Sequence, residues 1–128
     1  YQRMVKIFET LYAHCKYEVG EVTRSSDRFL VSVTVYPIDV ISKAEKNGIY
    51  DFEKSYGERA RKGEFDKLSD SEREELWADG IITEVEKNLD SIGYLDPVTI
   101  SLQVIIENDG YSIVDDDLVR MDELVISY

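Results

Sequence analysis

A repeat of apolar residues at every second position is the clearest structural signal in this chain of 128 residues. Apolar side chains occupy every second position from 29 to 35, which is the spacing of one face of a β-strand. Residues 17–22 are also rich in β-forming residues, and Gly20 interrupts them as a β-bulge would. Because Ser25-Ser26-Asp27 supplies a turn, residues 17–36 are predicted to form a β-hairpin.

A second alternating segment follows Pro97, with apolar residues at every second position from 98 to 104. Asn108-Asp109-Gly110 is predicted to be the turn that ends this strand, because the Asp-Gly step tolerates positive φ. Residues 111–114 would then return as the partner strand. The chain therefore carries a second predicted hairpin.

Three other segments repeat apolar residues at three- and four-residue spacing and predict helices over 2–15, 38–62 and 70–92. Asn47-Gly48 weakens the middle of the second helix, and residues 69–72 (Ser-Asp-Ser-Glu) match a capping box at the start of the third. The residues expected to face inward are Met4, Phe8, Leu11, Tyr12 and Cys15 in the first helix, Ile38, Ile41, Ala44, Phe52 and Tyr56 in the second, and Trp77, Ile81, Val85, Leu89 and Ile92 in the third.

The C-terminal residues return to helical spacing beyond Asp115, at Leu118, Met121 and Val125. A final strand over 124–127 is the alternative interpretation. Hairpins that are separated by helices favour an antiparallel sheet over the parallel sheet of strand–helix–strand folds. We therefore expect a single α+β domain over residues 1–128, with the sheet built from two hairpins and the helices packed on one face.

Composition and charge narrow the possible partners. Hydrophobic residues make up 43% and charged residues 33%, as in ordinary globular domains. The net charge is −12, which disfavours binding to nucleic acid or to anionic lipid surfaces. Residues 51–128 hold 21 of the 27 acidic side chains. We interpret these acidic residues as a solvated face, with a surface for cations or a basic partner as the alternative.

Recognisable catalytic and cofactor motifs are absent from the sequence. His14 is the single histidine, which excludes sites built on several histidine ligands. A dyad with Cys15 is not expected, because adjacent helical side chains diverge by about 100°. No glycine-rich phosphate loop occurs, so no cofactor is predicted. The lone cysteine excludes an internal disulfide, and no apolar run approaches the roughly 20 residues of a membrane span.

Two groups of residues are candidates for binding. Tyrosine combines a large apolar ring with a polar tip, and the chain holds nine tyrosines. Asn108 and four aspartates also crowd one region, but their spacing fails the EF-hand pattern, and turn and helix-cap roles explain them without a metal. The candidate ligand-binding residues are Tyr36, Tyr56, Tyr94 and Tyr111, with Tyr50 as a further member, and the candidate metal ligands are Asp109, Asp115, Asp116 and Asp117.

Three stretches of the chain resemble a known family. Residues 16–22 (KYEVGEV), 33–39 (VTVYPID) and 89–98 (LDSIGYLDPV) are similar to stretches of uncharacterised lipoproteins from clostridia and related Gram-positive bacteria. The resemblance covers most of the chain. It implies a cystatin-like or NTF2-like domain, held outside the cell by a lipidated N-terminal cysteine. That cysteine is not Cys15, so the anchor and an N-terminal portion of the domain are expected to be absent from this chain. The family offers no catalytic residues to transfer.

Three functional hypotheses follow. The first is a non-catalytic cell-surface module that binds a small ligand, a peptide or a protein. The alternative is a hydrolase-type enzyme that uses Asp, Glu or Tyr in a cavity between sheet and helices. A third hypothesis is a structural role, in which helix 2–15 contacts a missing N-terminal part or a second copy. An exposed apolar patch on that helix would favour the third hypothesis.

Overall fold

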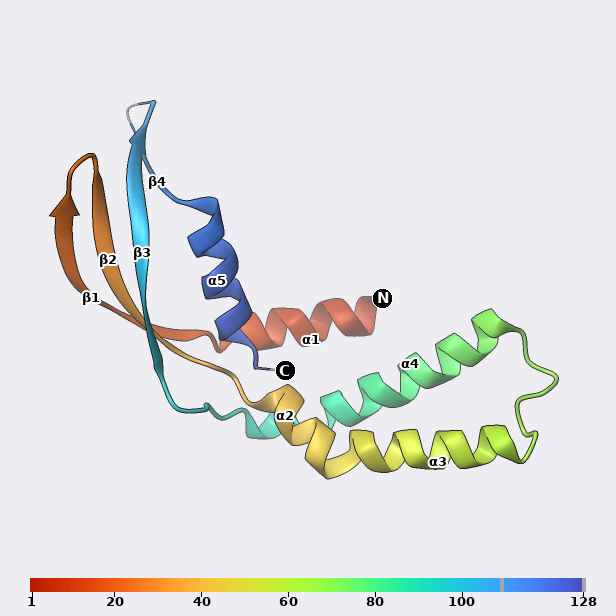
Figure 1. The fold of residues 1–128 in the computed structure, drawn as a ribbon. Helices are drawn as coiled ribbons and strands as arrows, with labels where there is room; N and C mark the ends of the chain where they lie inside the picture. Colours follow the sequence, from red (N-terminus) through yellow and green to blue (C-terminus); the bar gives the residue numbers. More distant parts are fainter. Residues whose placement is uncertain (109, 128) are drawn as a thin grey trace.

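The computed structural model describes residues 1–108 and 110–127 (Figure 1). In that part of the chain, four strands form an open antiparallel sheet in the order β1-β2-β3-β4, with helices packed against it. The predicted α+β fold class is therefore confirmed. The elements are α1 (Gln2–Ala13), β1 (Lys16–Ser25), β2 (Arg28–Tyr36), α2 (Val40–Ala44), the π-helix η1 (Glu45–Ile49), α3 (Tyr50–Arg61), α4 (Asp70–Glu86), the 3-10 helix η2 (Leu89–Ser91), β3 (Val98–Glu107), β4 (Gly110–Ile113) and α5 (Asp115–Val125).

Cross-strand pairing gathers the alternating apolar residues on one face of the sheet. In the register of β2 and β3, Val33 lies opposite Ile100 and Val31 lies opposite Leu102. Directly opposite residues of an antiparallel pair share a face. We call this the inner face, because Val33 and Leu102 are both buried on it, each with 3% exposure. Helix α5 lies over this face (Figure 1).

The predicted bulge in the first hairpin is confirmed. Val19 lies opposite Val33, but the next recorded pair is Val22 with Val31, so β1 has one extra residue in this interval. Val19 and Val22 therefore both point to the inner face, although they are three positions apart. The inner-face positions of β1 are odd-numbered before the bulge and even-numbered after it.

The second hairpin also forms where the sequence predicted it. β3 and β4 are antiparallel, and their pairing ends with Glu107 opposite Gly110. Asn108 has φ of +46°, a left-handed conformation that asparagine tolerates better than most residues. Asp109 lies outside the described residues. Because β4 has four residues and β3 has ten, most of the length of β3 has no partner in β4.

The first helix, α1, ends at Ala13, and the face that it packs against the core differs from the predicted one. Ile7 and Leu11 are buried, whereas Met4, Phe8 and Tyr12 are 37–47% exposed. The prediction that these three residues face inward was wrong. All five belong to one broad apolar arc, and helical periodicity alone does not say which part of such an arc meets the rest of the fold.

The segment predicted as one helix over 38–62 is helical from Val40 to Arg61, and the weakness at Asn47-Gly48 appears as the π-helix η1. π-Helical turns are rare in proteins and occur mostly as single-turn insertions in α-helices. Phe52 and Tyr56 are half-buried as expected. In the described residues, no helix is long and apolar enough to cross a membrane.

Two glycines permit the close approach of the helices around α4. A Cβ atom on Gly48 would lie 1.9 Å from Glu84 Oε2, and a Cβ atom on Gly80 would lie 2.0 Å from Cζ of Phe52. At the other end of the pair, Tyr56 stacks on Phe65 with ring centroids 4.8 Å apart. The Phe52 ring therefore leaves no room for another carbon at Gly80, and the Tyr56–Phe65 contact holds the loop between α3 and α4 against α3.

Helix α4 begins as predicted but is shorter than predicted. The hydroxyl oxygen of Ser69 accepts a hydrogen bond from the Glu72 amide at 3.1 Å, which confirms that half of the predicted capping box. The helix ends at Glu86, where the buried Asn88 donates its side-chain amide to the Glu84 carbonyl. The expectation of a helix to residue 92 was therefore wrong, as was the inward position of Trp77, which is 44% exposed.

Ile38 does not begin a helix. It lies between β2 and α2 and pairs with residues 125–127 near the C-terminal end of the chain. The Ile38 amide donates to the Val125 carbonyl at 2.8 Å, and the Ser127 amide donates to the Ile38 carbonyl at 3.0 Å. These two bonds form an isolated parallel bridge between Ile38 and Ile126. The predicted helix over residues following Asp115 is confirmed, and the alternative strand over 124–127 is reduced to this bridge.

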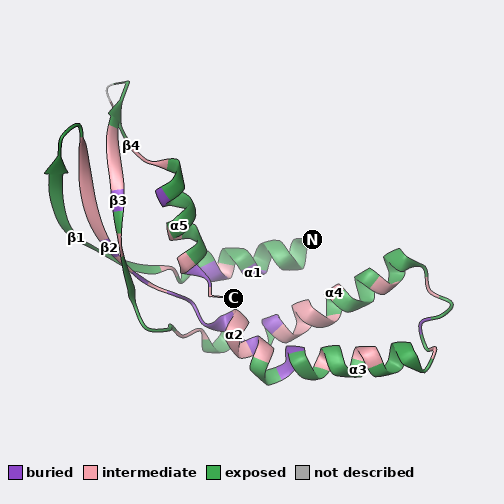
Figure 2. Ribbon diagram, in the orientation of Figure 1, coloured by how far each residue is buried: buried purple, intermediate pink, exposed green. Residues whose placement is uncertain are grey.

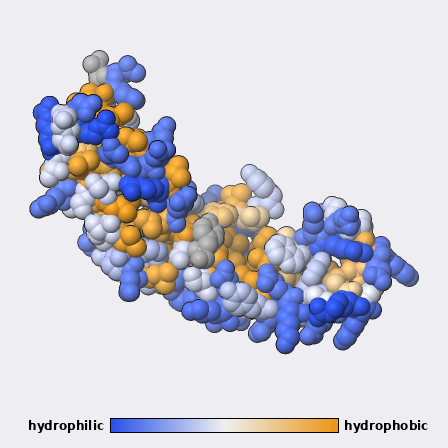
Figure 3. Space-filling model, viewed as in Figure 1, coloured by the Kyte–Doolittle hydropathy of each residue, from blue (hydrophilic) through white to orange (hydrophobic). Residues whose placement is uncertain are grey.

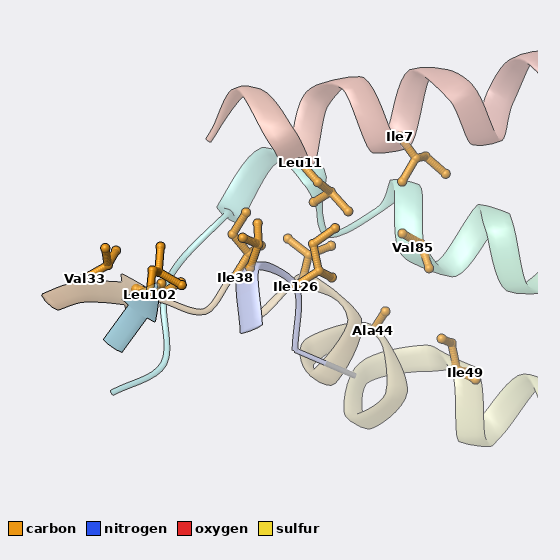
Figure 4. Packing of buried hydrophobic residues seen from close by; sticks show 12 residues of the cluster. Ile7, Leu11, Val33, Ile38, Ala44, Ile49, Val85, Leu102 and Ile126 are labelled. Atoms are coloured by element: carbon orange, nitrogen blue, oxygen red, sulfur yellow. The ribbon is translucent and has the colours of Figure 1, made fainter. Parts of the chain in front are cut away.

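The other side of the same segment is paired as well. The Leu95 amide donates to the Pro37 carbonyl at 2.8 Å, and Asp39 and Gly93 exchange backbone and side-chain hydrogen bonds. Residues 37–39 are therefore held between 93–95 and 125–127, an arrangement that we call the Ile38 junction. Ile38 and Ile126 lie between Leu11 of α1 and Ala44 of α2 in the core (Figure 4). The buried residues concentrate at this end of the sheet (Figure 2).

The contact between Gly80 and Phe52 predicts opposite effects for two glycine substitutions. Gly80→Ala forces the Phe52 ring away, and we expect it to lower the free energy of unfolding by about 1–3 kcal/mol. Gly57→Ala in α3 meets only the end of Arg61 at 3.8 Å, so we expect a stability gain of roughly 0.5–1 kcal/mol from reduced backbone entropy. Urea unfolding measures both, and equal effects of the two substitutions would contradict this packing.

Candidate functional site

Helix α5 is fixed against the edge of β3 that β4 leaves unpaired. The Val114 amide donates to the Gln103 carbonyl at 2.9 Å, and the Gln103 amide donates to Oδ2 of Asp117 at 2.7 Å. Arg120 donates to the Ser101 carbonyl at 2.9 Å and to Oδ1 of Asp117 at 3.0 Å. Asp117 is buried. The start of α5 therefore takes over the hydrogen-bonding groups of β3 that a longer β4 would have satisfied.

This placement leaves one side of the inner face uncovered. Val33 of β2 and Leu102 of β3 are nearly inaccessible, but Tyr17, Val19 and Val22 of β1 are 53–61% exposed. All five residues belong to the same apolar face of the same sheet. A single helix that lies over β2 and β3 does not reach β1, so the inner face is half covered and half open.

An apolar groove lies between the open half of this face and α5, and we call it the sheet groove. It has a volume of about 270 Å³ and contains no charged side chain in its lining, so it suits an apolar group better than a polar or charged one. Hydrophobic residues are visible along the sheet and α5, whereas hydrophilic residues dominate the end formed by α3 and α4 (Figure 3). The lining residues are Tyr17, Val19, Val31, Val33, Leu102, Val104, Ile113 and Met121.

The sequence predicted the alternation that builds this groove but did not place a groove on it. The alternating residues of β2 and β3 were predicted only to share one face of each strand. A signal was nevertheless available: the apolar alternation extends back through Tyr17 and Val19, while a single helix follows the second hairpin. The sheet therefore presents more apolar face than that helix can cover.

The candidate tyrosines do not converge on one site. Tyr36 and Tyr94 lie near each other, since the Lys16 ammonium is 4.4 Å from the Tyr36 ring centroid and 5.6 Å from that of Tyr94. Tyr56 belongs to the α3–α4 contact, where its hydroxyl donates to the Arg73 carbonyl. Tyr111, which is 72% exposed, contacts Phe29 at the opposite end of the sheet. Tyr50 is exposed on the first turn of α3.

Tyr94 lines a second, larger hollow near the Ile38 junction, which we call the basal groove. It has a volume of about 630 Å³ and is open to solvent. Its lining includes the acidic residues Asp96 and Glu123. A smaller hollow of about 390 Å³, between β3, β4 and the start of α5, is lined by Glu107, Asp115 and Asp116, so the hydrolase alternative has acidic groups in both places. The Tyr94 hydroxyl donates a hydrogen bond to the His14 carbonyl oxygen at 2.6 Å. The hydroxyl proton of Tyr94 is therefore used in a contact within the fold. The remaining lining residues of the basal groove are Pro37, Leu95, Val98, Leu124 and Ser127.

The candidate metal ligands are divided between different roles. Asp117 binds the β3 backbone and Arg120, as described above, whereas Asp115 and Asp116 are exposed in the first turn of α5. There they are placed to interact favourably with the helix dipole. Asp109 lies outside the described residues. Among those that are described, no group of three or more His, Cys, Asp or Glu side chains could hold a metal ion.

The two potentially reactive residues near the end of α1 are separately engaged. His14 places Nδ1 2.8 Å from the Thr10 carbonyl oxygen. Cys15 follows the helix and packs against the core, and this partial burial raises the pKa of its thiol, because desolvation disfavours the thiolate. A thiol with a raised pKa is a poorer nucleophile at neutral pH.

Comparison with known proteins supports the fold. No protein-family model matches this chain, and no curated protein matches its sequence. A solved structure, "a putative lipoprotein (ycdA) from Bacillus subtilis subsp. subtilis str. 168", matches 99% of this chain with a TM-score of 0.63. The two are 17% identical, and this chain spans 38% of the length of the other. The likeness shows a shared fold; a cystatin-like or NTF2-like assignment stays a prediction.

The role of Asp117 predicts a large difference between adjacent aspartates. Asp117→Ala leaves the Gln103 amide and Arg120 without their carboxylate, and we expect it to lower the free energy of unfolding by about 1–3 kcal/mol. Asp116→Ala removes an exposed carboxylate in the same turn and should change it by less than about 0.5 kcal/mol. Chemical denaturation of both variants measures the difference, and an equal loss would show that the helix dipole rather than the β3 contact dominates.

Proposed function

We propose that this chain is a non-catalytic binding domain of an extracytoplasmic lipoprotein and that its ligand is an apolar group held in the sheet groove. The observation that carries the proposal is the half-covered inner face, on which Tyr17, Val19 and Val22 lie exposed beside buried residues. Contiguous apolar surface on a soluble domain typically marks a binding site.

The chemistry of the groove limits the class of ligand. Apolar side chains supply the lining except for the hydroxyl of Tyr17 at its open side. A volume of about 270 Å³ is at the small end of ligand sites, so it accommodates one alkyl chain or a few apolar side chains rather than a large cofactor. The net charge of −12 also favours neutral ligands over anionic ones.

The state of the buried carboxylates supports a non-catalytic role. A carboxyl group that acts as a general acid or base must be free to contact a substrate. In the described residues, the two buried aspartates are both engaged: Asp39 accepts from the Gly93 amide and pairs with Lys43, and Asp117 binds β3 and Arg120. Their hydrogen bonds join segments of the fold.

The proposed location outside the cell rests on two independent likenesses. The fold matches a Bacillus subtilis protein that is named as a lipoprotein, and three stretches of the sequence resemble extracytoplasmic lipoproteins of Gram-positive bacteria. A lipid anchor would precede the domain in the parent protein. Binding of nucleic acid is not part of this proposal.

The proposal is tested with Nile red, a neutral dye whose fluorescence increases in apolar surroundings. We expect the dye to bind the native protein, and we expect Val19→Asp to weaken binding at least tenfold, because a carboxylate would stand in the groove lining. Val119→Asp is the matched control: Val119 on α5 is 56% exposed and lies outside the lining, while Val19 is 61% exposed. Fluorescence titration gives the dissociation constants.

A second substitution separates the sheet groove from the exposed face of α1. Phe8→Asp places the same charge on α1, where Tyr1, Met4, Val5, Phe8 and Glu9 flank another apolar hollow. If Phe8→Asp abolishes dye binding and Val19→Asp does not, the ligand site is on α1 and the proposal is wrong. Far-UV circular dichroism of each variant confirms that the fold is retained.

A further inference from the structure

One edge of the sheet is covered by other parts of the fold, and the other edge is exposed. The β3 edge beyond β4 is blocked by α5, through Val114, Asp117 and Arg120. The opposite edge is β1, which is ten residues long and in the described part of the chain forms its strand ladder with β2 alone. All ten residues of β1 are exposed. An unblocked edge of this length is a template for another strand.

The bulge in β1 makes this edge complementary to itself. If two copies paired antiparallel over the whole of residues 16–25, residue i would lie opposite residue 41 − i. In a regular ten-residue strand, this register would set inner-face residues against outer-face residues, because i and 41 − i have opposite parity. The extra residue between Val19 and Val22 reverses the parity of the second half of β1, so that inner-face positions meet inner-face positions throughout.

The resulting pairs are chemically compatible on the inner face. Val19 would lie opposite Val22, which joins two exposed apolar side chains, and Tyr17 would lie opposite Arg24. An aromatic ring and a guanidinium group form a favourable pair, and Arg24 is already within 5.8 Å of the Phe29 ring centroid in the single chain. Each of these pairs would occur twice, because the two copies are related by a two-fold axis.

Charge does not oppose the same register. Lys16 would lie opposite Ser25, Glu18 opposite Thr23 and Glu21 opposite Gly20, so no two like charges face each other directly. β1 as a whole is neutral, with two basic and two acidic residues, although the net charge of the chain is −12. Self-association through this edge therefore avoids the acidic part of the surface.

We propose that β1 is a dimerisation edge that pairs antiparallel with β1 of a second copy, with residue i opposite residue 41 − i. The two sheets become one continuous sheet of eight strands. A two-fold axis perpendicular to the sheet keeps both inner faces on the same side, so the open halves of the two sheet grooves meet in one apolar trough between the two α5 helices. The inference stands on the strand edge and does not depend on which ligand occupies the groove.

Cysteine cross-linking tests the register. In a Cys15→Ser background, Val19→Cys combined with Val22→Cys places cysteines opposite each other in two copies, at a spacing that a disulfide can bridge. We expect oxidation to give a covalent dimer in high yield. Each single cysteine variant should give little dimer. Val19 and Val22 lie opposite Val33 and Val31 of β2, so in this register identical residues are displaced by about 7 Å along the strands in addition to the spacing between strands, which is too far for an unstrained disulfide. Efficient cross-linking of either single variant would overturn the register.

The oligomeric state tests the edge itself. Light scattering coupled to size exclusion should give about twice the protomer mass for the unmodified chain. Val22→Lys should return it to the protomer mass, whereas the control Val119→Lys, at nearly the same exposure (57% against 56%), should leave the dimer intact. A protomer mass at every concentration up to 0.5 mM would overturn the proposal. So would a dimer that Phe8→Lys on α1 disrupts and Val22→Lys does not.

Dye binding separates the two proposals. If the chain binds Nile red and is monomeric at all concentrations, the proposed ligand groove is supported and the proposed dimer is wrong. If the cross-linked dimer forms but binds no dye, the proposed dimer is supported and the proposed apolar ligand is wrong.

Discussion

The Ile38 junction is the constraint on which the rest of this fold depends. Three segments that are distant in the sequence meet at residues 37–39, and backbone hydrogen bonds join them on both sides. Because Ile38 directly follows β2 and Pro37, the junction lies where the sheet meets α2. It binds the end of α5 through Val125 and Ser127, and it binds the segment that leads into β3 through Leu95. The helices and the sheet are therefore linked through the backbone as well as through the apolar core around Ile38 and Ile126.

The position of α5 follows from this junction and explains the open half of the sheet. The C-terminal end of α5 is held at Ile38, and its N-terminal end is held on the β3 edge by Asp117. A helix of 11 residues fixed at both points covers β2 and β3 and leaves β1 uncovered. The sheet groove and the free β1 edge are two consequences of one asymmetry, because the element that closes one side of the sheet cannot also close the other.

Local patterns predicted the elements well and the exposed surfaces poorly. Alternation at 29–35 and 98–104, the bulge at Gly20, and the cap at Ser69 each depend on neighbouring residues, so the sequence contained the information needed. The inward side of α1 depended on which part of a broad apolar arc meets α4 and η2, and Met4 and Phe8 were placed on the wrong side. The same limit applies to the candidate site. Composition drew attention to Tyr36, Tyr56, Tyr94 and Tyr111, which the tertiary structure separates, whereas the groove arises from the long-range placement of α5, which brings Met121 of the helix to the same groove as Leu102 of β3.

Native-state hydrogen exchange at the Ile38 junction is the most direct test of this account. The amides of Ile38, Leu95 and Ser127 all donate backbone hydrogen bonds within it. If the junction fixes the fold, these three amides exchange only when the whole domain unfolds, with the same free energy as amides in the paired centre of β2 and β3. The amide of Ser127 is the most telling, because a residue so close to a chain end ordinarily frays. Exchange of Ser127 and Ile38 at the rate of an unprotected peptide, while β2 and β3 stay protected, would contradict the account.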